Sequence, residues 1–349
     1  MRFRTPLLFA TAVVLAMGSM VLGLAVMPAA SPAMSDVPGK EFAPVNRPGP
    51  SLSVPAQDLA ASLWCNSDLS GASREPVLLV PGTTLTPQVN FSWNYARVFE
   101  AAKWPFCTVT LPDHAMGDIQ VAAEYEAYAI RAMYRAAGRK VQVVGYSQGG
   151  MLGRWALRFW PDTRPMVDDL VGLDPSNHGT LASYAFCAVG CAPAFFQQMM
   201  SSNFLTALNS YQETFAGISY TQIYTPTDEV VIPNFGPAAS SSLHTGDGWI
   251  ANISVAWICP VHVAEHLTMG SSDPVGYALV LDALTHAGPA DPTRVSRAVC
   301  AETLMPGVDP IDFPANFAAL TLTVVEQLAT YPHVPTEPPL KFYVYATTG

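Results

Sequence analysis

The stretch VVGYSQGGMLGRWAL, residues 143–157, decides how this chain should fold. Ser147 stands between Gly145 and Gly149, after a run of small β-branched residues and before a helical pattern of apolar residues. A strand that runs into Gly-x-Ser-x-Gly and then into a helix is the context of a nucleophile elbow. The glycines permit the tight turn because they carry no side chain. We interpret Ser147 as a catalytic nucleophile; the alternative is a glycine-rich turn that happens to contain a serine.

Strand and helix patterns alternate along the chain on both sides of this stretch. Residues 119–138 and 148–160 have helical spacing of apolar residues. Short apolar runs predict strands at 76–80, 106–112, 140–146, 168–174, 219–225 and 252–258. This alternation predicts βαβ units and a mainly parallel central sheet flanked by helices. Together with the nucleophile-elbow context of Ser147, it predicts an α/β-hydrolase fold. Residues 181–214 are small, apolar and rich in Met and Phe, which predicts a small helical cap over a pocket; a plain core helix has the same composition.

The amino terminus has the features of a secretory signal peptide. Arg2 and Arg4 precede an apolar run at 7–26, and Ala30 and Ala33 are candidate cleavage points. The run is also long enough to span a bilayer, so a retained anchor is the alternative. We divide the chain into a leader at 1–33, an arm rich in Pro, Gly and Ser at 34–56, a hydrolase domain at 57–330 and a tail at 331–349.

Charge and cysteine content exclude some classes of function. The 17 basic and 27 acidic residues give a formal net charge of −10, and removing a leader with two arginines and no acid makes it −12. Such an acidic chain is a poor candidate for nucleic-acid binding. No Cys-x-x-Cys pair occurs with metal-spaced histidines, so we expect no zinc site. Acyl transfer through a serine nucleophile needs no metal and no organic cofactor, so we expect neither. An even number of cysteines in an exported chain favours disulfides, here among Cys65, Cys107, Cys187, Cys191, Cys259 and Cys300.

The acid and the base should follow the nucleophile in the order acid, then histidine. Asp174 and Asp228 both follow predicted strands. We favour Asp228, which comes one strand later and precedes the apolar pair 230–231; Asp174 would then be a buried carboxylate near the pocket. His262 and His266 are the candidates for the base. We favour His266, which lies farther from the strand and opens an apolar stretch.

An oxyanion hole needs backbone donors from two places in this fold. In VLLVPGTTL, residues 77–85, Gly82 allows close approach, and Thr83 offers a backbone N–H and a hydroxyl. Gln148 offers a second N–H at the start of the helix after Ser147. The alternative is that Pro-Gly-Thr-Thr is only a turn.

Five segments resemble the lipase B family, which includes a yeast enzyme and bacterial relatives. They are VLLVPGTTLTPQVNFSWNY (77–95), WPFCTVTLPD (104–113), YSQGGMLGRWALRFWP (146–161), IYTPTDEVVIPN (223–234) and ICPVHVAEHLTM (258–269). They occur in the family's order, and the similarity spans roughly residues 58 to 300 of what looks like a bacterial member. The resemblance implies that Ser147 is the nucleophile, Asp228 the acid and His266 the base. It implies that Thr83 and Gln148 are the oxyanion donors.

The resemblance also bears on the pocket and the disulfides. It implies that Asp174 lies beside the active site, and we expect the substrate pocket to involve Asp174, Tyr146 and Leu85. Tyr146 stands where the family has a tryptophan that lines the alcohol side of the pocket, so we expect a different pocket shape there. The family pairs the cysteines that match Cys65–Cys107 and Cys259–Cys300. Cys187 and Cys191 have no counterpart, and we predict a local bridge that stiffens the cap. The family's final disulfide is missing, so we expect different packing after about residue 302.

Together these features predict a secreted or cell-surface serine hydrolase of carboxylic esters, specifically a triacylglycerol lipase. We expect a monomer that acts on an ester or lipid substrate at a lipid–water interface and binds no nucleic acid. Three alternatives remain open: an esterase for short soluble esters, an acyltransferase or peptidase that uses the same residues, and a non-catalytic surface-anchored protein.

Overall fold

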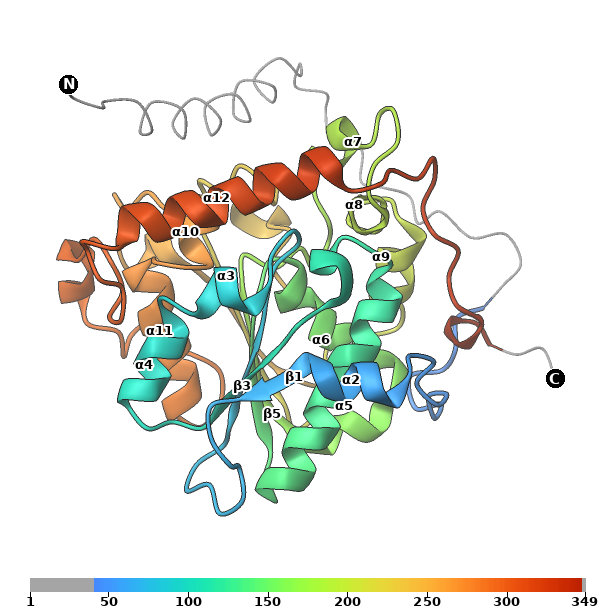
Figure 1. Ribbon diagram of the computed structural model, residues 1–349, viewed down its shortest axis with the longest axis horizontal. Coiled ribbons are helices and arrows are strands. Elements are labelled where there is room, and N and C mark those ends of the chain that lie inside the picture. Colours follow the sequence, from blue (N-terminus) through green and yellow to red (C-terminus); the bar gives the residue numbers. More distant parts are fainter. Residues whose placement is uncertain (1–40, 347–349) are drawn as a thin grey trace.

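A seven-stranded sheet forms the centre of the protein (Figure 1). The computed structural model describes residues 41–346, so the predicted leader at 1–33 lies outside the described residues. The strands are β1 (Leu63–Cys65), β2 (Val77–Val80), β3 (Phe106–Val109), β4 (Val141–Tyr146), β5 (Val167–Leu173), β6 (Ser219–Tyr224) and β7 (Trp249–Ser254). Their order in the sheet is β1-β3-β2-β4-β5-β6-β7, and every pair is parallel except β1 with β3. This arrangement confirms the predicted fold class.

Helices connect the parallel strands and cover the sheet, as parallel pairing requires. The α-helices are α2 (Ala56–Ser62), α3 (Pro87–Phe91), α4 (Tyr95–Ala101), α5 (Ile119–Ala137), α6 (Gln148–Phe159), α7 (Ala182–Phe186), α8 (Pro193–Gln197), α9 (Asn203–Leu208), α10 (His266–Met269), α11 (Pro274–Thr285) and α12 (Phe313–Thr330). Short 3₁₀ turns are Pro112–Ala115, Pro161–Met166, Gly236–Ala238, Val255–Trp257, Arg297–Ala301 and Phe342–Val344. Within residues 41–346, no helix has the length and apolar character needed to cross a bilayer.

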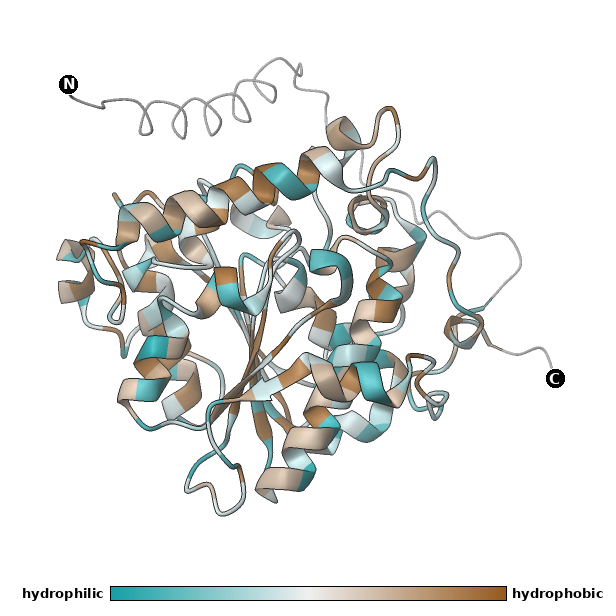
Figure 2. Cartoon of the chain, in the orientation of Figure 1, coloured by the Kyte–Doolittle hydropathy of each residue, from teal (hydrophilic) through white to brown (hydrophobic). Residues whose placement is uncertain are grey.

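Two apolar cores form, one on each face of the sheet. Successive residues of a strand point to opposite faces, so in β2 Leu78 and Val80 join one core while Val77 and Leu79 join the other. The first core contains side chains of α5 and α6, and the second contains side chains of α4 and α11. Figure 2 shows apolar residues concentrated on the central strands. Both faces of the sheet are therefore buried, and its carboxyl edge is left for the site.

Three differences from the predicted elements stand out. The last strand was expected at 252–258 but is β7, which ends at Ser254; there the Ser254 hydroxyl accepts a hydrogen bond from the Ala256 N–H (3.3 Å) and opens a 3₁₀ turn. Strand β1 was not predicted, and it pairs with β3 beside the Cys65–Cys107 disulfide. Helix α12 was not predicted either. In Figure 1 it runs across the carboxyl edge of the sheet, above α3 and α10.

The six cysteines form three disulfides: Cys65–Cys107, Cys187–Cys191 and Cys259–Cys300. These are the expected pairs, including the local bridge in the cap. The predicted cap region contains the three short helices α7, α8 and α9. The described part of the predicted arm lies against the domain, where Trp160 Nε1 donates to the Pro50 carbonyl (2.9 Å). The division of the chain into leader, arm, domain and tail stays a prediction.

Candidate active site

Ser147 lies on a sharp turn between β4 and α6. Its backbone has a positive φ of 53°, and its N–H donates to the carbonyl of Leu173 at the end of the neighbouring strand (2.8 Å). A β-carbon on Gly145 would overlap the carbonyl of Gly149, and one on Gly149 would overlap the carbonyl of Val80. Both glycines of the motif are therefore required by close backbone approach. The side chain of Ser147 is buried but lines a pocket.

A chain of hydrogen bonds links three side chains that come from separate segments. His266 Nε2 lies 3.1 Å from Ser147 Oγ, and His266 Nδ1 lies 3.0 Å from Asp228 Oδ2. Ser147 follows β4, Asp228 follows β6, and His266 begins α10. With the proton on Nδ1, the imidazole donates to Asp228 and offers its Nε2 lone pair to the Ser147 hydroxyl. This geometry allows the hydroxyl to pass its proton to His266.

The Asp228 carboxylate is held by backbone N–H groups two and three residues later in the chain. Its Oδ1 accepts hydrogen bonds from the N–H groups of Val230 and Val231, each at 2.8 Å. Its Oδ2 accepts from Asn234 Nδ2 (3.2 Å) in addition to the imidazole. The loop after β6 thus orients the carboxylate toward His266.

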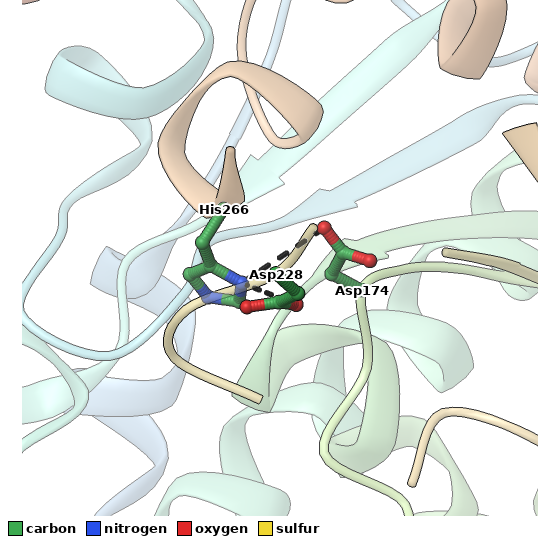
Figure 3. A group of neighbouring side chains, drawn as sticks. All are labelled: Asp174, Asp228 and His266. Carbon is green, nitrogen blue, oxygen red and sulfur yellow. Dashed lines mark hydrogen bonds and ion pairs between the residues drawn. The ribbon is translucent and has the colours of Figure 1, made fainter. Parts of the chain in front are cut away.

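Asp174 lies beside Asp228 and faces the same imidazole (Figure 3). Its Oδ2 is 3.9 Å from His266 Nδ1 and has no hydrogen-bond partner, while its Oδ1 accepts from the Thr225 N–H (2.9 Å). Burial and the nearby Asp228 carboxylate raise the pKa of Asp174 well above its ordinary value. Asp174 is fully buried and does not line the pocket, which differs from the expectation that it borders the substrate.

Acidic side chains also surround the backbone and imidazole of His266. Burial lowers the pKa of this histidine, but Asp228 and, more weakly, Glu229 raise it, and the net pKa lies above 6.5. The Glu265 carboxylate caps α10 by accepting from the N–H groups of Leu267 (3.0 Å) and Thr268 (2.7 Å). Burial and Glu229 raise the pKa of Glu265 to about 7.

The two expected oxyanion donors come from separate segments near the serine. Gln148 is the first residue of α6, so its N–H is one of the groups that a helix amino terminus leaves without an intrahelical acceptor. Its side-chain Nε2 donates to the carbonyl of Ala115 (3.0 Å). Thr83 follows β2 and lines the pocket, and its Oγ1 accepts from Gln198 Nε2 (3.2 Å). Both segments are held by side-chain hydrogen bonds.

The pocket over Ser147 has a volume of about 400 Å³ and a mostly apolar lining. Tyr146 and Leu85 line it, as expected. Helix α7 of the cap contributes Phe186. Helix α12, which the sequence analysis missed, contributes four residues on one helical face, Thr321, Val324, Val325 and Leu328. Their i, i+3, i+4, i+7 spacing was the signal that could have revealed this helix.

One group of metal-ligand types occurs among residues 41–346: Asp174, Asp228 and His266 offer ligand atoms within 4.8 Å of one another. These are the groups already described beside Ser147. With a proton on Nδ1, His266 has no lone pair to offer a metal ion there. His262, the alternative candidate for the base, lies elsewhere and is bonded to Asp273 at the start of α11.

Comparisons with known proteins agree with this architecture. Residues 128–252 match the family model described as Lipase (class 2). The chain is 32% identical to Lipase B of Pseudozyma antarctica over 250 residues, and this aligned region covers 69% of this chain and 72% of that protein. The chain belongs to the lipase B family. The crystal structure of Aspergillus fumigatus lipase B is similar to this family member with a TM-score of 0.78 and 30% identity, over 88% of this chain and 76% of that one. As a lipase B family member, the chain is a carboxylic ester hydrolase.

Proposed function

We propose that this lipase B family member is a secreted triacylglycerol lipase that acts through Ser147, His266 and Asp228. The observation that supports this most directly is the hydrogen-bond chain from Ser147 through His266 to Asp228, of which Ser147 and His266 line a mostly apolar pocket. Thr83 and Gln148 are proposed as the oxyanion donors. The bacterial origin implied by the sequence resemblance stays a prediction.

The proposed reaction is acyl transfer to water in two steps. Ser147 Oγ attacks the ester carbonyl carbon while its proton passes to His266 Nε2, and the Thr83 and Gln148 N–H groups hold the resulting oxyanion. The carbon–oxygen bond to the alcohol then breaks, His266 protonates the leaving alcohol, and the acyl group remains on Ser147. In the second step water attacks the acyl carbon and gives its proton to His266. The proton returns to Ser147 Oγ as the fatty acid leaves.

The pocket and the surface around it support a lipid substrate. The pocket lining is mostly apolar and includes side chains of the cap and α12, which suits an acyl chain. Several large apolar side chains of the cap are exposed, namely Leu181, Tyr184, Phe186 and Val189. Exposed apolar side chains beside a pocket suit contact with a lipid–water interface. Three disulfides are typical of proteins in oxidising compartments, which supports export.

The decisive experiment is Ser147→Ala, assayed with a p-nitrophenyl ester. We expect kcat to fall by about 10⁴–10⁶-fold while the protein stays folded. Ser62→Ala is the matched control, since Ser62 is a buried serine on α2 remote from the pocket. Unchanged turnover in Ser147→Ala would exclude the proposal. If a fluorophosphonate probe labels no serine in the folded parent, the non-catalytic alternative is favoured instead.

The substrate class needs a separate measurement. We expect faster hydrolysis of emulsified long-chain triacylglycerol than of short soluble esters, and release of fatty acid rather than transfer to an added alcohol. A preference for short soluble esters would make the protein an esterase, and dominant transfer would make it an acyltransferase. The mass of the exported chain tests the leader, with cleavage expected after Ala30 or Ala33.

A further inference from the structure

Tyr146 lies next to the proposed nucleophile and touches the proposed base, yet the reaction above gives it no role. It is the last residue of β4 and only 2% exposed. Its phenol O–H donates to the backbone carbonyl of His266 (2.9 Å). The two rings pack with centroids 5.0 Å apart at an interplanar angle of 40°. Tyr146 therefore joins the strand that carries Ser147 to the residue that carries the imidazole.

The ring of Tyr146 also fits between two glycines. A β-carbon on Gly82 would lie 2.8 Å from Cδ1 of the ring, and one on Gly270 would overlap the opposite edge, Cδ2–Cε2. Gly82 immediately precedes Thr83, and Gly270 ends α10, which His266 begins. One aromatic ring thus contacts the oxyanion loop, the nucleophile strand and the histidine helix. Such close packing leaves the three segments little room to shift against one another.

His266 has reason to need this support. Helix α10 contains only four residues, too few to be stable on its own hydrogen bonds. Side chains hold both polar groups of the His266 backbone: the N–H donates to Glu229 Oε2 (3.2 Å), and the carbonyl accepts from Tyr146. Asp228 bonds the imidazole of His266 and does not hold its backbone.

We propose that Tyr146 is a positioning residue for ester hydrolysis, which fixes the backbone of His266 relative to Ser147 through its O–H and its ring. The inference rests on the proposed roles of Ser147 and His266. It differs from a role in shaping the pocket wall, which needs the ring but not the hydroxyl.

Tyr146→Phe separates these two roles, because it keeps the ring and removes only the O–H. We expect kcat for an activated ester to fall about tenfold with KM unchanged, because a buried hydrogen bond that sets the geometry of the base is lost. The rate of reaction of Ser147 with a fluorophosphonate probe should fall in the same proportion. Tyr343→Phe is the matched control: Tyr343 is also buried, its O accepts from Trp155 Nε1 (3.1 Å), and it lies outside the pocket.

The outcomes distinguish this inference from the proposed function. Equal kcat in Tyr146→Phe and the parent would overturn the positioning role, while Ser147→Ala still tests the reaction itself. Equal losses in Tyr146→Phe and Tyr343→Phe would also overturn it, because they would reflect general loss of stability. Titration with the fluorophosphonate probe counts the reactive serines, so that kcat is expressed per folded site in each variant. If Ser147→Ala retains turnover, both proposals fail together.

Discussion

Asp174 and Asp228 share a single amide donor: Asn234 Nδ2 lies 3.2 Å from Asp174 Oδ1 and 3.2 Å from Asp228 Oδ2. Two buried carboxylates this close repel each other if both are ionised. Asp228 receives three further donors, from two backbone N–H groups and an imidazole, whereas the Oδ2 of Asp174 has none. These donors favour a negative charge at Asp228 over one at Asp174, and burial and the nearby Asp228 carboxylate raise the pKa of Asp174 well above its ordinary value.

This division of charge predicts opposite effects for two matched substitutions. Asp228→Asn should lower kcat by about 10⁴-fold, because an amide can no longer stabilise the imidazolium or enforce its tautomer. Asp174→Asn should leave kcat within about threefold of the parent, since burial already disfavours the ionised carboxylate and the amide keeps an acceptor for Thr225. Steady-state hydrolysis of one activated ester measures both. A large loss in Asp174→Asn would mean that Asp174 is ionised and takes part in the reaction.

The pKa of His266 predicts the pH dependence of the reaction. Only the neutral imidazole can accept the Ser147 proton, so kcat/KM should fall as the pH drops through the pKa of His266. Because that pKa is raised, the midpoint should lie above 6.5. Glu229 contributes to the raised value, so Glu229→Gln should move the midpoint to lower pH while keeping an acceptor for the His266 N–H. Glu100→Gln, an exposed change on α4, should leave the profile unchanged. An unmoved midpoint in Glu229→Gln would contradict this account.

Local patterns predicted most of the fold, and the failures have physical causes. Strands β2 to β6 and helices α5 and α6 are marked by local patterns of the right period, and these residues pack in the core as the patterns suggest. Strand β1 has only three residues, one of them the exposed Trp64, so it carries no periodicity; pairing with β3 creates it. The segment of α12 around LTLTVV is rich in β-branched residues, which favour strands in isolation. The tertiary packing of α12 against α3 and over the pocket outweighs this strand preference.

The candidate site divides in the same way. Ser147, Asp228 and His266 stand in recognisable segments and follow the chain order of the fold, so sequence reasoning could select them. The roles of Asn234 and Tyr146 depend on contacts between residues far apart in the sequence: Asn234 reaches Asp174, and Tyr146 reaches His266. Neither contact has a motif, because each arises only when loops from different strands meet at the sheet edge.

Glu126 predicts how stability changes with pH. Its side chain is fully buried on α5, neither carboxylate oxygen has a hydrogen-bond partner, and burial raises its pKa to about 8. The native state therefore keeps the proton after the unfolded chain has lost it. Its contribution should lower the free energy of unfolding by about 1.4 kcal/mol per pH unit between the unfolded and native pKa values.

Removing this ionisable group should remove that pH dependence. Glu126→Gln should gain stability relative to the parent as the pH rises from about 5 to about 8, as measured by denaturant unfolding at several pH values. Glu326→Gln, at an exposed position on α12, should follow the parent. A constant difference between Glu126→Gln and the parent across this range would show that Glu126 is not a buried protonated acid.

The bridge between Cys187 and Cys191 predicts an effect on substrate binding that exceeds its effect on stability. It joins residues with a sequence separation of 4, whereas Cys65 and Cys107 have a separation of 42. The lost entropy of the unfolded chain therefore predicts that the two bridges stabilise the folded state by about 2 and about 4 kcal/mol, respectively. Yet the cap bridge directly follows Phe186, which lines the pocket, and Cys191 exchanges backbone hydrogen bonds with Val334, beyond α12 (3.2 and 2.8 Å). The bridge thus links the cap, which contributes Phe186 to the pocket, to the segment that follows α12, which also contributes pocket residues.

The double variant Cys187→Ser/Cys191→Ser should therefore raise KM for long-chain esters several-fold and leave kcat for a short activated ester unchanged. The variant Cys65→Ser/Cys107→Ser should lose more stability and keep the parent's KM, because its bridge joins two strands away from the pocket. Chain-length series with both variants, at a temperature where both are folded, provide the measurement. If the cap variant keeps the parent's KM for long chains, the bridge stabilises the loop without shaping the acyl pocket.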